Sequence, residues 1–127
     1  MVKKNIFTFI VILLLLSFDV GKKQECTATH YNTAKHPIVY RQHSTAAVSR
    51  DLAESLKLEI GKKEKGVIKQ KGSFLVVTNV SNNKSDTVEV TDRCAAGPNH
   101  IDLSKTSFVK IANLKQGRIK VFIKKIN

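Results

Sequence analysis

Residues 76–104, VVTNVSNNKSDTVEVTDRCAAGPNHIDLS, decide the fold of this chain of 127 residues. The stretch opens inside an apolar, β-branched run over residues 74–80, which favours a strand. An Asn-Asn pair at 82–83 follows, and asparagine reaches the φ > 0 geometry of a tight hairpin turn. In residues 87–91 valines alternate with polar residues, which is typical of a half-buried strand. We therefore predict a β-hairpin that ends at the acidic Asp92, with a helix start further on.

The order of motifs in this stretch resembles that of a known family. VTN, a turn, V-x-V-x-D-R-C and IDLS follow one another as in the double-psi β-barrels of rare lipoprotein A, the expansins and the barwin-like proteins. The resemblance extends more weakly from Thr27 to about Lys124, with A-T-x-Y near its start and T-A-A at residues 45–47. It implies a mainly β fold, a small six-stranded double-psi β-barrel with one or two short helices, over residues 26–125.

The rest of the chain supplies the other elements of such a barrel. Leu52 and Leu56 stand four apart, as on one face of a helix, and Ser104 is a suitable N-cap. Short strands and short helices without long βαβ units fit a small closed barrel better than a layered α/β domain. The predicted strands outside the hairpin cover residues 27–32, 43–49 and 118–124, and the predicted helices cover residues 50–60 and 105–114.

Residues 1–18 are predicted to be a secretory signal peptide. Lys3 and Lys4 precede an apolar run over residues 6–18, which is too short for a comfortable transmembrane helix. The cleavage site is poorly marked and is expected within residues 17–25. An uncleaved anchor is the alternative, and only then would the chain be held at a membrane. We expect a secreted, extracellular or cell-wall protein that is a monomer and needs no cofactor.

The chain has two cysteines, Cys26 and Cys94. An oxidising compartment favours their pairing, which predicts a disulfide between the start of the first strand and the turn after Arg93. Its long loop would stabilise the fold by roughly 3–4 kcal/mol in the chain-entropy view. Two free thiols are the alternative.

The charge of the chain indicates a polyanionic partner. The formal net charge is +12 at pH 7, and it is +10 without Lys3 and Lys4. For a secreted protein, a cell-wall polymer, an acidic glycan or a phospholipid headgroup fits better than nucleic acid. Residues 61–72, GKKEKGVIKQKG, carry five lysines against one glutamate and are predicted to form a basic loop or hairpin. A solvated surface without a dedicated partner is the alternative for both observations.

Asp92 is the first candidate for a chemical role. The resemblance implies that this aspartate lines the substrate groove beside Arg93 and that enzymatic members of the family require it. Asp92 as general acid would need a second carboxylate or a base. The histidine that follows T-A-A in the enzymes is replaced by Val48, and residues 33–44 contain no acidic residue. Binding without hydrolysis therefore fits better, and a structural role, as a partner of Arg93 or a turn cap, is the alternative.

Two tyrosines are the candidates for stacking on a sugar ring. The face of a tyrosine ring packs on apolar C–H groups while its hydroxyl finds a polar partner. Tyr31 is expected to line the groove with Thr45 and Asp92, and Tyr40 is the second candidate. The alternative is that each ring is half-buried at a strand end. The chain has no tryptophan, so a long row of aromatic side chains is excluded.

Other polar residues carry weaker signals. The four histidines and two cysteines form no H-x-H or C-x-x-C pair, so no metal site is expected. Asn79 and Asn83 each begin a glycosylation sequon near the predicted turn. Asp102 in IDLS is predicted to be structural, accepting N–H bonds at the start of a helix.

Together these patterns predict a secreted double-psi β-barrel that interacts with cell-wall polysaccharide or another polyanionic glycan, by binding or loosening it rather than hydrolysing it. One alternative is a lytic transglycosylase or glycosidase with Asp92 as general acid. The other is a secreted effector or protease inhibitor with a protein partner.

Overall fold

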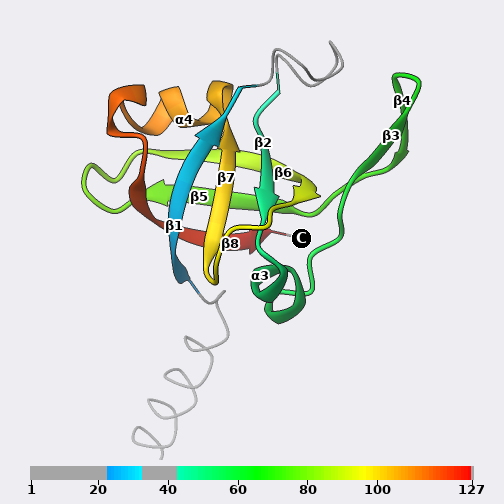
Figure 1. Ribbon diagram of the computed structural model, residues 1–127, viewed down its shortest axis with the longest axis horizontal. Coiled ribbons are helices and arrows are strands. Elements are labelled where there is room, and N and C mark those ends of the chain that lie inside the picture. The colour runs from blue at the N-terminus through cyan, green and yellow to red at the C-terminus, as the bar shows by residue number, and fades with distance from the viewer. Residues whose placement is uncertain (1–22, 33–42, 127) are drawn as a thin grey trace, which may run out of the picture.

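The computed structural model describes residues 23–32 and 43–126. Six strands close into a barrel in the order β1–β7–β2–β6–β5–β8, and the hairpin β3–β4 projects from its wall (Figure 1). The pairs β1–β7 and β2–β6 are parallel, and the other four barrel pairs are antiparallel. The predicted six-stranded barrel with short helices is confirmed. The elements are β1 (Gln24–Tyr31), β2 (Thr45–Val48), α3 (Arg50–Ser55), β3 (Lys62–Glu64), β4 (Val67–Gln70), β5 (Phe74–Asn79), β6 (Ser85–Arg93), β7 (His100–Ser104), α4 (Lys105–Ile111), the 3-10 helix η2 (Leu114–Gln116) and β8 (Ile119–Ile126).

The hairpin predicted from the opening stretch is the pair β5–β6. Its strands pair antiparallel, with Thr78 opposite Ser85 next to the turn. Asn83 has a φ of 62°, the left-handed geometry expected of the Asn-Asn turn. Val88 and Val90 are fully buried, as the alternation predicts. This hairpin therefore follows directly from the sequence pattern.

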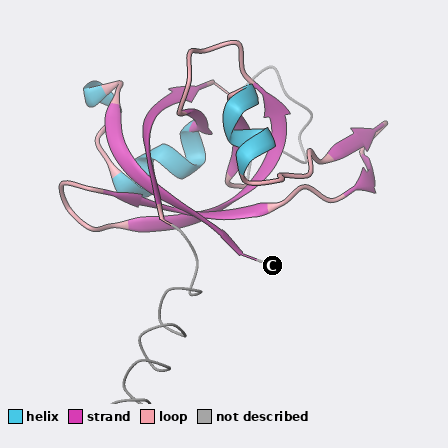
Figure 2. Cartoon of the chain, turned by 90° about the horizontal axis from the view of Figure 1, so that it is seen from below, coloured by secondary structure: helices cyan, strands magenta, loops and turns pink. Residues whose placement is uncertain are grey.

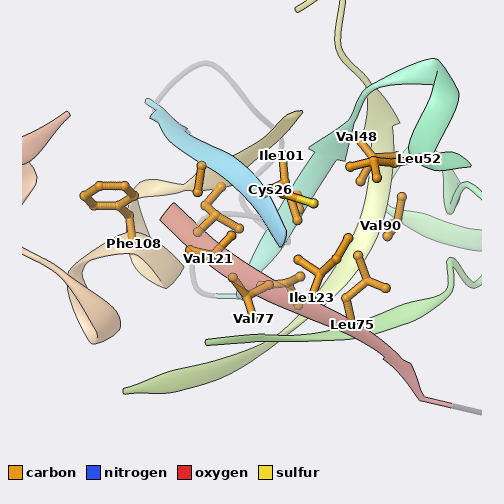
Figure 3. Close-up of a cluster of buried hydrophobic side chains, with 14 of the residues drawn as sticks. Cys26, Val48, Leu52, Leu75, Val77, Val90, Ile101, Phe108, Val121 and Ile123 are labelled. Atoms are coloured by element: carbon orange, nitrogen blue, oxygen red, sulfur yellow. The ribbon is translucent and has the colours of Figure 1, made fainter. Parts of the chain in front are cut away.

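The barrel interior is filled by the inward-facing residues of all six strands, and the helices close its ends. Figure 3 shows Phe108 of α4 and Leu52 of α3 at opposite ends of the buried cluster. Both side chains are fully buried. Because the inward residues alternate with outward ones along each strand, the outer face keeps polar side chains. The strand residues of the cluster are Cys26, Ala28, Ala46, Val48, Leu75, Val77, Val88, Val90, Ile101, Leu103, Ile119, Val121 and Ile123.

Two helix predictions need correction. The helix expected over residues 50–60 ends at Ser55, because Lys57 has a φ of 51° in the left-handed region. The helix expected over residues 105–114 ends at Ile111, and the IDLS motif that precedes it belongs to strand β7. The next helix, α4, starts only after Ser104, whose hydroxyl accepts the N–H of Ser107 at 3.3 Å as an N-cap. The cap was predicted correctly, and the strand before it was not.

The basic segment 61–72 forms the hairpin β3–β4, which stands clear of the barrel in two perpendicular views (Figures 1 and 2). Its base is tied to β6: Gly61 N donates to Val90 O at 2.9 Å, and Val90 N donates to Ser73 O at 2.9 Å. The direction of the hairpin is therefore set by the barrel strand that leads to Asp92.

The predicted signal peptide, residues 1–18, and the candidate Tyr40 lie outside the described residues. Within the described part of the chain, no helix has the length and apolar character needed to cross a membrane.

Candidate functional site

A surface pocket of about 300 Å³ crosses four neighbouring strands of the barrel, β1, β7, β2 and β6. It is built from side chains that point outward, opposite to those that fill the core. The pocket unites the sequence candidates Tyr31, Thr45, Asp92 and Arg93, and adds residues that were not predicted. We call it the outer groove. Its lining is Tyr31, Asn32, Thr45, Ala47, Thr91, Asp92, Arg93, Cys94 and Asp102.

Strand register places two carboxylates on either side of a small residue. Ala47 of β2 is opposite Asp92 of β6 and also opposite Asp102 of β7. Two strand spacings separate the Cα atoms of these aspartates by about 10 Å. The pairing of β2 with β6 shifts after Val90, which leaves Thr91 as an extra residue. Without this bulge, the alternation that buries Val90 would turn Asp92 toward the core.

Asp102 is held by a chain of hydrogen bonds that starts at a buried histidine. Thr29 Oγ1 donates to Asp102 Oδ1 at 2.9 Å, and His100 Nε2 lies 2.8 Å from the same threonine oxygen. Since the threonine proton goes to the carboxylate, the imidazole must donate its Nε2–H to the threonine. Asp102 is therefore held in a fixed position in the groove, and its described hydrogen bond is to a threonine hydroxyl instead of the predicted N–H groups at the start of a helix.

Tyr31 is fixed by its hydroxyl, which lies 2.6 Å from Thr45 Oγ1. Thr45 is only 2% exposed, so it positions the tyrosine and offers little surface of its own. Burial raises the pKa of Tyr31 above its ordinary value of 10, and the negative charges of Asp102 and Asp92 act in the same direction. The phenol therefore stays protonated at neutral pH and can donate a hydrogen bond.

Asp92 and Arg93 form the open edge of the outer groove. Both are exposed, and the backbone N–H of Arg93 donates to Asp92 Oδ1 at 2.8 Å. This bond is the local turn contact that was considered as a structural alternative for Asp92. It occupies one carboxylate oxygen and leaves the other directed to solvent or ligand.

The predicted disulfide between Cys26 and Cys94 is absent, and both thiols are free. Cys26 is 2% exposed inside the barrel (Figure 3), whereas Cys94 lines the outer groove. The strand order puts β7 and β2 between β1, which carries Cys26, and the end of β6, which precedes Cys94. A disulfide needs adjacent positions with Cα atoms at most about 7 Å apart. The sequence could not reveal this separation.

The two thiols should differ sharply in reactivity. Burial raises the pKa of both thiols, that of Cys26 to about 12, and only thiolates react readily; Cys94 is also within reach of a reagent in the outer groove, whereas Cys26 is not. We expect a thiol reagent such as Ellman's to titrate one cysteine, Cys94, in the native protein and both after denaturation, without added reductant. Cys94→Ser should abolish the native reaction and leave one thiol in the unfolded chain. No thiol in either state would contradict the free cysteines and restore the disulfide.

The two sequon asparagines differ in the folded protein. Asn79 is 1% exposed, and its side-chain nitrogen donates to Ile111 O at 2.8 Å. A glycan at Asn79 would remove this buried bond, so the folded protein does not suit modification there. Asn83 is exposed at the turn, and its modification stays a prediction. Among the described residues there is no group of three or more potential metal ligands from His, Cys, Asp and Glu.

His100 should make folding sensitive to mild acid. Burial lowers the pKa of His100 below its ordinary value of 6.5; Asp102 opposes this shift and Arg118 adds to it. As pH falls below about 6.5 the unfolded chain takes up the proton first, so the free energy of unfolding decreases, by at most about 1.4 kcal/mol per pH unit. Above that pH the imidazole is neutral in both the folded and the unfolded state, so His100 no longer makes the free energy of unfolding depend on pH.

Urea unfolding at about pH 7.5 and about pH 5 tests this expectation. His100→Gln keeps an N–H donor for Thr29 and should reduce the difference in unfolding free energy between the two pH values. The lowered pKa of Asp51 changes the free energy of unfolding only in stronger acid, near and below the ordinary aspartate value of 3.8. An equal pH difference in the wild type and in the variant would contradict the role given to His100.

The barrel order, its two parallel pairs and the outer groove define a double-psi β-barrel protein. Residues 23–123 match the model of the double-psi β-barrel family that is described as lytic transglycolase, and the chain belongs to this family. A protein of Synechocystis sp., itself called uncharacterized, is 42% identical over 55 residues, which cover 43% of this chain and 58% of that relative.

Solved structures of low sequence identity share the fold. An expansin of Clavibacter michiganensis without ligand has a TM-score of 0.63 and 20% identity, over 84% of this chain and 51% of the expansin. A mutant of that expansin in complex with cellohexaose has a TM-score of 0.60 and 19% identity over the same shares. The Streptomyces papain inhibitor has a TM-score of 0.58 and 21% identity, over 86% of this chain and 98% of the inhibitor. The chain thus spans about half the length of the expansin.

Proposed function

We propose that the protein binds a cell-wall polysaccharide in the outer groove, outside the cytoplasm, and holds or loosens the polymer without hydrolysing it. The observation that carries this proposal is the convergence of Tyr31, Asp92 and Asp102 in one pocket across four strands. The expansin solved in complex with cellohexaose supports it, because that protein shares the barrel fold over about half of its length.

The chemistry of the outer groove suits a sugar chain. Carboxylates accept hydrogen bonds from sugar hydroxyls, and an aromatic face packs against the C–H groups of a ring. Asp102 is fixed by Thr29, and Tyr31 by Thr45, so binding requires little ordering of either side chain. Arg93 adds a donor at the open edge. The groove can therefore hold a neutral pyranose ring with acceptors on both sides of Ala47.

Co-sedimentation with insoluble peptidoglycan, chitin and cellulose, each at low and high salt, tests the proposal. We expect retention that resists salt on one of the three polymers and is weakened by Tyr31→Ala. Val109→Ala, an exposed position on α4, serves as the matched control and should leave retention unchanged. Retention that salt abolishes on all three polymers, or that Tyr31→Ala does not change, would contradict binding in the groove.

One observation favours a second candidate function, cleavage of the glycan. Glycan-cleaving enzymes of the two-carboxylate type use a pair of acids in one site, and Asp102, which was not predicted as a partner, lines the same groove as Asp92. Incubation of the protein with the polymer that retains it, followed by analysis of soluble products, separates the candidates. Soluble saccharides that the wild-type protein releases and Asp92→Asn does not would establish cleavage. If the wild-type protein releases none, binding without cleavage is the function that remains.

The Streptomyces papain inhibitor favours a further candidate, a protein-binding role. The two chains match over 98% of the inhibitor, so the shared fold accounts for nearly all of that solved chain. Inhibition of papain in a peptidase assay would support this role, and retention on a glycan without any inhibition would exclude it.

A further inference from the structure

We propose that the β3–β4 hairpin adds a second subsite to the outer groove, specific for a carboxylate or phosphate group on the same glycan chain. This inference rests on the proposed function and narrows its substrate class to acidic polysaccharides. It goes beyond general attraction by the basic surface, because it assigns the anion to one place in the fold.

A second hollow lies between the hairpin and the barrel, next to the outer groove. The two share Thr91 and Asp92, so a chain that leaves the groove past Asp92 enters the hollow directly. Lys62 and Lys69 of the hairpin line it as well. The full lining is Gly61, Lys62, Lys63, Glu64, Lys69, Thr91 and Asp92.

The barrel fixes the position of this hollow. Gly61 N and Ser73 O both bond to the backbone of Val90, two residues before Asp92. Gly72 N also donates to Glu89 Oε2 at 3.3 Å. The base of the hairpin is thus held on the strand that carries Asp92, so the lysines keep their place relative to the groove.

The two hollows differ in the balance of their charges: three lysines line the hairpin hollow against Glu64 and the shared Asp92, whereas Asp92 and Asp102 line the outer groove with Arg93. Residues 61–72 hold five lysines and one glutamate. The ion pairs Arg50–Glu54 and Lys110–Asp86 of the described residues involve neither Lys62 nor Lys69. The outer groove instead carries Asp92 and Asp102. A neutral ring therefore fits the groove, and an anionic substituent on the next residue of the chain fits the hairpin.

The tip of the hairpin suggests a competing partner, an anionic lipid surface. Val67 and Ile68 are 57% and 48% exposed there, next to the lysines. The lysines that line the hollow lie near the base of the hairpin and share it with Thr91 and Asp92, on the groove side. This arrangement favours the glycan, and lipid binding becomes an outcome of the test.

The test compares retention of the purified protein on three forms of insoluble peptidoglycan. The forms are untreated, treated with hydrogen fluoride to remove phosphate polymers, and amidated at the carboxyl groups. The variant K62Q/K63Q/K69Q removes three charges from the hollow. The control K105Q/K115Q/K120Q removes three charges from α4, η2 and β8; α4 lies on the opposite side of the barrel from the hairpin in Figure 1.

We expect the hairpin variant to bind untreated peptidoglycan about tenfold more weakly than wild type and to lose the preference for the charged form. The control variant should keep that preference. Weaker wild-type binding after amidation assigns a carboxylate, and weaker binding after hydrogen fluoride assigns a phosphate; either supports the subsite.

Three results would overturn the subsite. If the wild-type protein is retained equally on all three forms and Tyr31→Ala still weakens this retention, the subsite is contradicted and the proposed function is supported. An equal loss of retention in both triple variants would mean that overall charge, and not the position of the lysines on the hairpin, determines binding. Retention on phosphatidylglycerol vesicles but on no form of peptidoglycan would contradict both the subsite and the proposed function.

Discussion

Gly72→Ala is expected to lower the free energy of unfolding by about 2–4 kcal/mol, because it forces a side chain into a backbone contact. A Cβ at this position would lie 1.9 Å from Val90 O and 2.9 Å from Gly61 N. Neither atom belongs to a flexible side chain, so the base of the hairpin must move away from β6. That movement breaks the bond from Gly61 N to Val90 O, worth about 1 kcal/mol, in addition to the strain.

Gly97→Ala is the matched control for this substitution. Nothing lies within 4 Å of a Cβ added at Gly97, so its unfolding free energy should stay within about 0.5 kcal/mol of wild type. Urea unfolding of both variants gives the comparison. Equal stability of the two variants would mean that the hairpin is not clamped to β6, and would weaken the case for a fixed subsite.

Asp102→Asn is expected to weaken glycan binding by roughly tenfold or more, because it removes the charge that strengthens each hydrogen bond accepted from the sugar. The amide has nearly the same shape, and its oxygen still accepts the proton of Thr29. Stability should therefore change little, while retention on the polymer falls. Quantitative binding isotherms on the retaining polymer, with urea unfolding alongside, provide the measurement.

Two further variants make this result specific. Asp92→Asn should also weaken binding and leave the fold intact, since Asp92 is exposed and accepts a hydrogen bond from the neighbouring backbone N–H of Arg93. Glu54→Gln makes the same change of charge on α3, outside the groove lining, and should bind as wild type. A loss of stability in Asp102→Asn that matches its loss of binding would return Asp102 to a structural role.

The sequence predicted the parts of this molecule that depend on local pattern. The alternation of valines buried one face of β6, and the Asn-Asn pair supplied the turn that joins it to β5. Two glycines around a lysine-rich run predicted a projecting segment at residues 61–72. These signals act between residues close in the chain, so periodicity and turn chemistry are sufficient to detect them.

Contacts between strands that are far apart in the chain were not predicted from the sequence. Asp102 was predicted only as an acceptor of N–H bonds at the start of the following helix, and the strand that contains it was not predicted, although the motif HIDLS alternates polar and apolar residues as a strand does. That alternation was the missed signal. The bond from Thr29 to Asp102 joins positions 73 apart and depends on parallel pairing of β1 with β7, which no local pattern reveals. The same barrel order separates Cys26 from Cys94.

The central claim is that the outer groove binds sugar, and nuclear magnetic resonance titration of the isotope-labelled protein tests it most directly. The ligands are soluble peptidoglycan fragments and cellohexaose, added to the wild-type protein. We predict that one of them shifts the amide signals of Tyr31, Thr91, Asp92 and Asp102, with α4 and the outer face of β8 unchanged. Shifts spread over the surface lysines with none in the groove, or no shifts with either ligand, would contradict the account.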